Sequence, residues 1–401
     1  MNEIHIFDTT LRDGEQAPHH QMSIAQKVAL FNLLDAAGVD FIEIGFPAAS
    51  KIDFVATKIL AQLNRRACIS VFSRMTQSDI DIAAAAVNKK ENVQLQLLAV
   101  GSEIHLEKKR KITADRAIEE LTAAIQYSRA SGFQNISIGL EDALRGSLEW
   151  IHRLAEISIQ HNVNTLVIAD TVGGAIPSDF YELITDLRLF VGDKIQLSVH
   201  CHNDMGLAVA NAMEAIRAGA DCVQTTLCGI GERAGNSALE EILTILHYKP
   251  SAYLKKADVD LKKIYQACHF LVDALKLSLS YNKPILGENA FATTAGIHIN
   301  GILSDPNNYE FVEPNLFGRE RSFAISRLSG KSLIAYYFNK IGLPITNEQL
   351  EAMRISFFNE MDSSKYKSET DLLNLYFEEQ TNRDFLNLFK LNNQGEANES
   401  L

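Results

Sequence analysis

Short apolar runs alternate with longer amphipathic stretches from residue 4 to about residue 250. The stretches 23–38 and 113–132 have helical spacing of apolar residues and end in a glycine of the kind that caps helices. Strands alternating with helices predict a parallel sheet, and eight such units match the size of a (β/α)₈ barrel. A doubly wound open sheet is the main alternative, but no G-x-G-x-x-G pattern follows the first strand. The eight predicted strands are residues 4–7, 41–45, 68–72, 93–100, 135–140, 165–170, 195–200 and 222–227.

The last part of the chain departs from this alternation. Residues 282–314 look like a loop-rich segment, helical patterns follow Gly330, and the final residues are polar. We therefore expect two domains: a TIM barrel over residues 1–277 and a smaller, mainly helical C-terminal subdomain over residues 278–401.

Side chains that can bind a metal or transfer a proton stand at nearly every predicted strand end. In a barrel these ends and the loops after them converge on one rim, where active sites lie. His200 and His202 fall on the same face of their strand, because side chains alternate with period two. Two imidazoles on one side of a strand end suit a divalent metal, although each could instead be a hydrogen-bonded core histidine. The polar residues at strand ends are Asp8, Arg12, Glu43, Arg74, Glu141, Asp142, Asp170, Thr171, His200 and His202.

Composition and charge narrow the setting. The chain has 401 residues and a net charge of −12, which argues against a nucleic-acid partner and an anionic membrane surface. No apolar run approaches the roughly 18 residues of a membrane-spanning helix, and the first residues do not resemble a signal peptide. The five cysteines form neither a C-x-x-C pair nor a disulfide framework. We expect a cytoplasmic protein.

Four motifs, in this order, resemble the 2-isopropylmalate synthase and homocitrate synthase family of the DRE-TIM metallolyase superfamily. The resemblance runs from residue 8 to about residue 355. It implies a TIM barrel, an acyltransferase that condenses acetyl-CoA with a 2-oxo acid and then hydrolyses the thioester, one divalent ion (Mg²⁺, Mn²⁺ or Zn²⁺), and a homodimer. The motifs are FDTTLRDGEQ (7–16), HCHNDMGLAVAN (200–211), GIGERAGNSALEE (229–241) and AGIHINGIL (295–303).

The resemblance assigns roles around the metal. It implies that the ion is bound by Asp8, His200, His202 and Asn236, a mixed oxygen and nitrogen set that suits these metals. Arg12 would contact the substrate and stabilise the alkoxide as the carbon–carbon bond forms, or it could make a structural ion pair with a carboxylate such as Asp13. Thr171 would hydrogen-bond the substrate carboxylate.

The acid–base residues implied by the resemblance come from both domains. Glu141 and His298 would form the acid–base pair that removes a proton from the acetyl methyl group, with Tyr309 nearby. His298 could instead be a structural histidine on a loop. The basic run KKRK (108–111) could contact the phosphates of coenzyme A or be a solvated helix start, and both interpretations stay open.

The acceptor is less certain from sequence, and several features favour short, nitrogenase-associated homocitrate synthases, with 2-oxoglutarate as acceptor. Gly139 stands where isopropylmalate synthases usually carry a serine, and Gln96 where they commonly carry a histidine. We expect both residues in the substrate site. The segment 44–54 looks more like the isopropylmalate branch, which makes 2-oxoisovalerate or a related acid the alternative. No leucine-sensing regulatory domain is expected.

Two other classes stay open. An acyl-CoA lyase on the same barrel would carry a cysteine in the glycine-rich loop after the eighth strand, whereas GIGERAGN has none. A catalytically silent binding relative is the other, because residues 293–298 (TTAGIH) and 327–330 (RLSG) depart from the family patterns H-E-S-G-I-H and K-H-S-G.

Overall fold

The computed structural model describes residues 2–325, 330–359, 372–374 and 376–378. The chain divides into two compact units. The first comprises residues 1–280 and 284–286, and the second comprises residues 281–283 and 287–401.

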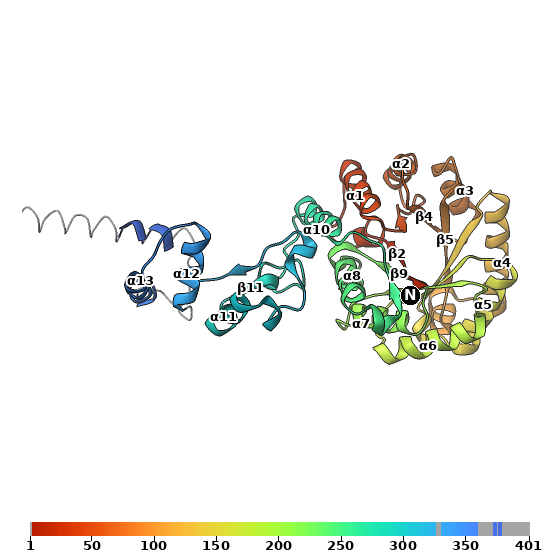
Figure 1. Cartoon of the computed structure of the whole chain (residues 1–401). Coiled ribbons are helices and arrows are strands. Elements are labelled where there is room, and N and C mark those ends of the chain that lie inside the picture. The colour runs from red at the N-terminus through yellow and green to blue at the C-terminus, as the bar shows by residue number, and fades with distance from the viewer. Residues whose placement is uncertain (1, 326–329, 360–371, 375, 379–401) are drawn as a thin grey trace, which may run out of the picture. The chain divides into compact units, whose positions relative to one another are not determined.

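The first unit is a closed barrel of eight parallel strands, which confirms the predicted fold (Figure 1). The eighth barrel strand pairs with the first and closes the barrel, with His5 opposite Cys222 and Asp8 opposite Thr225. All eight apolar runs predicted from the sequence form barrel strands. They are β2 (His5–Asp8), β3 (Phe41–Glu43), β4 (Cys68–Arg74), β5 (Val93–Val100), β6 (Asn135–Glu141), β7 (Thr165–Asp170), β8 (Gln196–Cys201) and β9 (Cys222–Thr225).

Helices surround the barrel strands (Figure 1). The first begins after Ser23, whose side chain and that of Gln26 form a capping box, and it ends at Gly38 with φ of 96°, a conformation that favours glycine. Both ends of this helix are therefore determined by residues next to them in the chain. The helices are α1 (Ile24–Ala37), α2 (Lys51–Leu60), α3 (Gln77–Ala86), α4 (Ala114–Ala130), α5 (Leu148–Gln160), α6 (Pro177–Val191), α7 (Ala208–Arg217), α8 (Leu239–Tyr248), α9 (Pro250–Tyr253) and α10 (Leu261–Leu275).

Short helical turns follow several strands. A 3₁₀ turn comes after β2, and a six-residue π-helix comes after β5, where the basic run 108–111 lies. Such π-helical segments are uncommon and are frequent at functional sites. These turns are η1 (Asp13–Gln16), η2 (His105–Arg110), η3 (Ala143–Arg145) and η4 (Leu227–Gly229).

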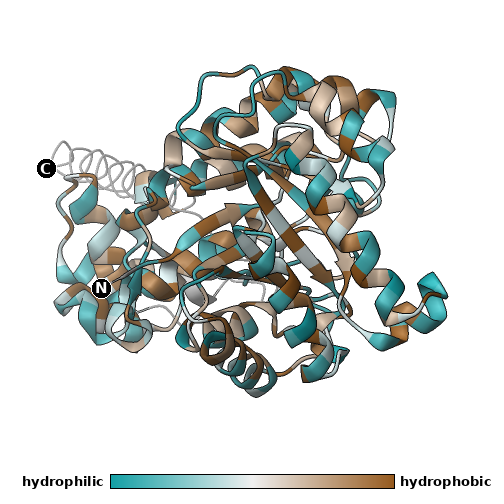
Figure 2. Cartoon of the chain, turned by 90° about the vertical axis from the view of Figure 1, so that its right-hand side faces the viewer, coloured by the Kyte–Doolittle hydropathy of each residue, from teal (hydrophilic) through white to brown (hydrophobic). Residues whose placement is uncertain are grey.

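The main core lies between the strands and the surrounding helices. Leu30, Phe31 and Leu34 of α1 are fully buried, as their helical spacing predicts. Figure 2 shows the barrel strands mainly in hydrophobic colours, while the helices carry both colours. A small parallel sheet of β1 (Asn2–Glu3) and β10 (Lys255–Lys256) accompanies the barrel.

The second unit has a small core of its own. Ile299, Ile302, Phe323, Ile334 and Phe338 are buried in it. Its elements are η5 (Glu288–Phe291), β11 (Ala292–Thr293), α11 (Gly296–Ser304), η6 (Pro306–Asn308), η7 (Pro314–Phe317), β12 (Ser322–Phe323), α12 (Lys331–Lys340) and α13 (Asn347–Asn359). Within the described parts of both units, no helix is long and apolar enough to cross a membrane.

The segment predicted as loop-rich contains helix α11. Ile299 and Ile302 are three residues apart and both buried, so they provide the apolar face that a short helix needs. Of the second unit's unusual motifs, residues 326–329 lie outside the described residues.

Candidate functional site

The two histidines of the H-x-H motif and one aspartate come together at the carboxyl end of the barrel. His200 is on β8 and His202 follows it, and their Nε2 atoms are 3.3 Å apart. Asp13, at the start of η1, places Oδ2 3.7 Å from Nε2 of His200. All three side chains are buried, and their ligand atoms lie within 4.8 Å of one another. Among the described residues, no other group of three acids, histidines or cysteines is close enough to share an ion. The strand's alternation thus placed both imidazoles as predicted.

The protonation states of this cluster suit metal binding. Burial lowers the pKa of His200 to about 3, which keeps the imidazole neutral with a lone pair available. Burial alone would raise the pKa of Asp13, but the adjacent Arg12 guanidinium outweighs it and holds that pKa well below its usual range. A neutral imidazole beside an ionised carboxylate is the state a divalent ion needs.

Asn236 completes the cluster through the glycine-rich loop. It forms an isolated bridge with His202, and its Nδ2 donates to Oδ1 of Asp13 over 2.8 Å and to the carbonyl of Ile230 over 3.2 Å. Because both partners are acceptors, the amide orientation is fixed, and the buried Oδ1 has no hydrogen-bond partner among the described residues. A Cβ on Gly231 would lie 2.0 Å from Nδ2 of Asn236, so this approach requires glycine.

The aspartate that meets the two imidazoles is Asp13, whereas the sequence predicted Asp8 as the ligand. Both oxygens of Asp8 accept hydrogen bonds from Thr10, one from its backbone N–H and one from its hydroxyl, each over 2.9 Å. Asp8 is fully buried, and that burial raises its pKa to about 7. It is not part of the group that contains the two imidazoles. Asp13, which sequence reasoning considered only as a partner of Arg12, is brought to the histidines by the turn after β2.

Arg12 lies between two carboxylates at the same place. Its Nε donates to Oε2 of Glu43 and its Nη1 to Oδ2 of Asp13, both over 2.7 Å, and the guanidinium carbon is 4.8 Å from the centre of the Phe72 ring. Burial alone would lower the pKa of Arg12, but Glu43 and Asp13 outweigh burial and raise it. Among the described residues, Nη2 has no hydrogen-bond partner. Arg12 can therefore keep its ion pairs with Glu43 and Asp13 and still have Nη2 available to donate to a ligand.

Glu141 ends β6 and is held by the π-helix. The ammonium group of Lys109 donates to both of its oxygens over 2.6 and 2.7 Å, and Nδ1 of His105 is 3.4 Å from Oε2. Arg110, the next residue of the basic run, instead bonds Glu120 of α4 over 2.7 Å. At least these two basic groups are committed to carboxylates of the chain, and a contact with phosphates stays a prediction.

Thr171 and Gly139 line the same space in different ways. The hydroxyl oxygen of Thr171 accepts the backbone N–H of Asp142 over 2.8 Å, which leaves the hydroxyl proton for a ligand. A Cβ at Gly139 would have no atom closer than 3.7 Å, and its backbone conformation does not require glycine. The glycine therefore leaves room in the cavity.

A cavity of about 270 Å³ joins these residues at the carboxyl ends of the strands. It brings together seven of the predicted site residues: Arg12, Gln96, Gly139, Glu141, Thr171, His200 and His202. Sequence reasoning missed several others, among them Asp13, Phe46, Phe72, Leu98, Val167, Ala169 and Gln224. For Gln224 the available signal was a polar residue inside a buried strand.

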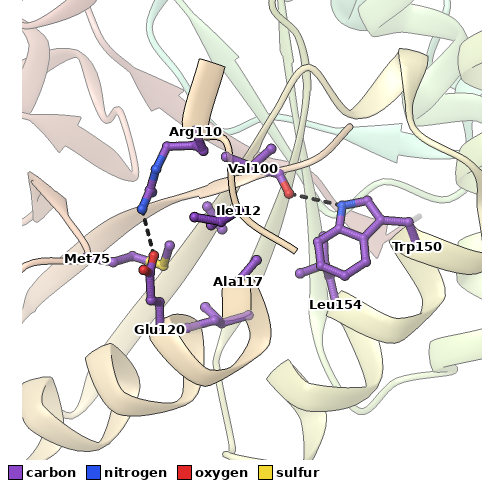
Figure 3. A pocket seen from close by; sticks show the side chains of 10 residues that line it. Met75, Val100, Arg110, Ile112, Ala117, Glu120, Trp150 and Leu154 are labelled. Atoms are coloured by element: carbon purple, nitrogen blue, oxygen red, sulfur yellow. Dashed lines mark hydrogen bonds and ion pairs between the residues drawn. The ribbon is translucent and has the colours of Figure 1, made fainter. Parts of the chain in front are cut away.

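A second pocket lies on the outside of the barrel, between the π-helix, α4 and α5 (Figure 3). Its volume of about 10 Å³ is room for a single water molecule. The ion pair of Arg110 with Glu120 and the hydrogen bond from Trp150 to the carbonyl of Val100 enclose it. We interpret it as a packing gap beside the end of the π-helix.

His298 and Tyr309 belong to the second unit. His298 is in the first turn of α11 rather than on a loop, and its ring centre is 4.3 Å from that of Tyr309. The Tyr309 ring packs so closely on Gly301 that a Cβ there would lie 2.4 Å from it. His298 and Tyr309, two of the predicted catalytic residues, are thus neighbours within their unit.

Comparisons with known proteins agree with the barrel and its motifs. Residues 3–271 match the HMGL-like family model, and residues 285–365 match a model described as homocitrate synthase post-HMGL domain-like. A 2-isopropylmalate synthase of Aquifex aeolicus is 37% identical over 94% of this chain and 73% of its own length. A 2-isopropylmalate synthase of Pyrococcus abyssi is 35% identical over 95% of this chain and 79% of its own length.

A solved structure of an HMG-CoA lyase from Bacillus subtilis has the same fold. It superposes with a TM-score of 0.60 at 20% identity, covering 70% of this chain and 96% of that one. At this identity the likeness speaks for the architecture alone. The barrel, the motifs and the curated relatives together show that the chain belongs to the HMGL-like family, within the DRE-TIM metallolyase superfamily.

Proposed function

We propose that this protein condenses acetyl-CoA with a 2-oxo acid that has a short aliphatic side chain, and then hydrolyses the thioester. Its curated relatives are named 2-isopropylmalate synthase, which places the chain among acyltransferases of this condensing kind. The observation that carries the proposal is the buried cluster of Asp13, His200 and His202 at the wall of a ligand-sized cavity, with Asn236 bonded to Asp13 behind it.

The residues present fit a divalent ion. Two ligand nitrogens about 2.1 Å from one ion and near right angles lie about 3 Å apart, close to the 3.3 Å between the two Nε2 atoms. The unpartnered Oδ1 of Asn236 and the ionised Asp13 supply oxygen ligands. We infer that these four residues hold one Mg²⁺, Mn²⁺ or Zn²⁺. Such an ion would polarise the ketone of the 2-oxo acid.

Arg12 and Thr171 would act directly on the 2-oxo acid. Arg12 is fixed by Glu43 and Asp13, so its free Nη2 can donate to the oxygen that gains negative charge as the new bond forms. Preorganised donors of this kind need no rearrangement in the transition state. The hydroxyl of Thr171 can donate to the substrate carboxylate.

We propose that proton transfer to and from the acetyl group is carried out by Glu141, His298 and Tyr309. The ammonium group of Lys109 bonds both oxygens of Glu141 and so fixes their orientation. The rings of His298 and Tyr309 lie with their centres 4.3 Å apart, tilted by 30°. The acetyl methyl group is a weak carbon acid, so its proton needs a positioned base.

The cavity lining favours an aliphatic acceptor over 2-oxoglutarate. Each of the two arginines that line the cavity is paired with a carboxylate of the chain, which leaves less positive charge for a second carboxylate of the acceptor. Arg74 binds both oxygens of Asp79 over 2.6 and 3.0 Å, and Arg12 is shared by Glu43 and Asp13. The homocitrate interpretation, which the relatives do not confirm, keeps support from the match of residues 285–365.

Release of free thiol from acetyl-CoA, measured with each 2-oxo acid in turn, tests the proposal. We expect turnover with 2-oxoisovalerate that exceeds turnover with 2-oxoglutarate, loss on adding a chelator, and recovery with Mn²⁺. Preference for 2-oxoglutarate would establish homocitrate synthesis instead. Cleavage of hydroxymethylglutaryl-CoA would indicate a lyase, and metal binding without any turnover would indicate a silent relative. The homodimer stays a prediction, which light scattering can check.

A further inference from the structure

Buried side chains form a continuous hydrogen-bonded chain from Glu43 to His200 across the barrel interior. Nε2 of Gln96 donates to Oε1 of Glu43 over 3.2 Å. Nε2 of Gln224 donates to Oε1 of Gln96 over 3.0 Å, and Oε1 of Gln224 is 2.9 Å from Nδ1 of His200. These four residues come from β3, β5, β9 and β8, and each is at least nine-tenths buried.

The direction of every bond in this chain follows from its first member. Burial raises the pKa of Glu43, while its ion pair with Arg12 favours the carboxylate form. A carboxylate can only accept, so Gln96 presents its NH₂ group to Glu43. The carbonyl oxygen of Gln96 must then face Gln224, where it accepts from Gln224 and from the hydroxyl of Ser137 over 3.3 Å. Gln224 therefore turns its own carbonyl oxygen to His200.

We propose that Gln96 and Gln224 are positioning residues that fix the tautomer of His200. With a carbonyl oxygen against it, Nδ1 of His200 must carry the proton, so Nε2 keeps its lone pair toward Asp13 and His202. A metal-bound histidine commonly donates its other ring N–H in this way, and the partner orients the ring. The inference rests on the metal site of the proposed function.

This assignment differs from the substrate-binding role expected for Gln96. Both lone pairs of its oxygen and one of its N–H groups are already used inside the barrel. At most one N–H group is left for a ligand. Most of the hydrogen bonds that Gln96 can make are therefore made to neighbouring side chains of the protein.

The chain offers a matched control two residues away on the same strand. Gln94 is 2% exposed, close to the 3% of Gln96, and its amide bonds the neutral side chains of Ser70 and Asn135. Gln94 has no link to His200 in this network. Gln94→Met thus removes a buried amide of the same strand while leaving the chain to His200 complete.

The first test measures Mn²⁺ affinity by calorimetry in the full-length protein. We expect Gln224→Met to weaken binding about tenfold or more, Gln96→Met to weaken it by a smaller factor, and Gln94→Met to leave it unchanged. Because the two residues act in series, the double variant should bind no more weakly than Gln224→Met. Wild-type affinity in Gln224→Met or Gln96→Met, or factors that multiply in the double variant, would overturn the proposal.

The second test reads the tautomer directly and needs no variant that might fail to fold. Ring-¹⁵N histidine spectra of the metal-free wild-type protein should show His200 protonated at Nδ1, with its signals identified by their absence in His200→Gln. A proton on Nε2 would overturn the proposal. Neither test uses an acceptor, so a failed condensation assay with the expected affinities and tautomer would refute the function and leave this inference standing.

Discussion

The cavity has two regions that carry similar charges in different surroundings. We call them the floor and the rim. In the floor, Arg12 pairs with Glu43 at 10% and 0% side-chain exposure, whereas at the rim Lys109 pairs with Glu141 at 51% and 17%. The floor consists of the lining residues Arg12, Asp13, Gln96, His200, His202 and Gln224, together with Glu43 and Asn236, which bond them; the rim consists of the lining residues Arg74, Glu141 and Thr171, together with Lys109, which bonds Glu141.

The difference in burial decides what each pair can do. Buried charges interact strongly because water does not screen them, and removing one partner leaves the other uncompensated. Pairs near the surface are screened by solvent and salt and contribute little to stability. The floor is therefore suited to hold charges in fixed positions, while the ion pair at the rim holds its partners less firmly.

The largest effect should separate the two aspartates of the first motif. Asp13→Asn removes the charged oxygen of the proposed ligand set, and we expect Mn²⁺ affinity to fall more than about 100-fold and condensation to fall to background. Asp8→Asn should keep metal affinity, because among the described residues both carboxylate oxygens of Asp8 bond Thr10 and Asp8 is not part of the histidine cluster. Calorimetry with Mn²⁺ checks both, and the reverse pattern would restore Asp8 as the ligand.

Substitutions of Arg12 test whether the floor needs the several fixed N–H donors of a guanidinium group. We expect kcat to fall about 10²- to 10³-fold in Arg12→Gln, the size typical of losing one donor to a developing oxyanion. Arg12→Lys should not restore it, since one ammonium group cannot bond Glu43 and Asp13 and still reach the cavity. Steady-state thiol release gives kcat, and a lysine variant with more than about a tenth of wild-type kcat would contradict this role.

Sequence reasoning succeeded where the deciding interactions are local. The period of a strand placed His200 and His202 on one face, and Ser23 and Gly38 marked the ends of α1. Asp8 and Asp13 are five residues apart in one motif, and only the path of the turn after β2 decides which meets the histidines. A pattern along the chain cannot show that path.

The buried network was beyond sequence reasoning for a different reason. Gln96 and Gln224 are 128 residues apart, and their amide orientations depend on Glu43 from a third strand. The role of each glutamine thus follows from its neighbours in the barrel. Gln94 and Gln96 have the same residue type, strand and burial, yet only Gln96 is linked to the floor.

Asp8 tests the effect of burial itself through the pH dependence of stability. Burial raises its pKa from 3.8 to about 7, so between about pH 4 and pH 7 the folded state holds a proton that the unfolded state has released. Stability should therefore fall as pH rises through this window. Between pH 5 and pH 7 the wild type should lose about 2 kcal/mol of unfolding free energy more than Asp8→Asn.

The single tryptophan, Trp150, is buried in α5 and reports unfolding of the barrel by fluorescence. Urea titrations at the two pH values give the free energies for both proteins. Equal pH slopes in the wild type and in Asp8→Asn would mean that Asp8 titrates normally in the fold.

Lys109 should give the smallest effect, because its pair with Glu141 is half exposed. Lys109→Met leaves both oxygens of Glu141 without the ammonium group that orients them. We expect kcat/KM to fall about tenfold, with Mn²⁺ affinity and unfolding free energy close to wild type. Arg116→Gln is the matched control, since Arg116 pairs with Glu119 and Glu120 on the surface of α4, outside the residues that line the cavity.

Salt sharpens this last comparison. Screening weakens the wild-type ion pair at the rim, so raising the ionic strength should narrow the gap between wild type and Lys109→Met. The gap between wild type and Arg12→Gln should persist, because the Arg12–Glu43 pair is largely buried and salt screens it much less. A Lys109 effect that is as large as that of Arg12 and insensitive to salt would mean that the rim is closed over the ligand and works as part of the floor.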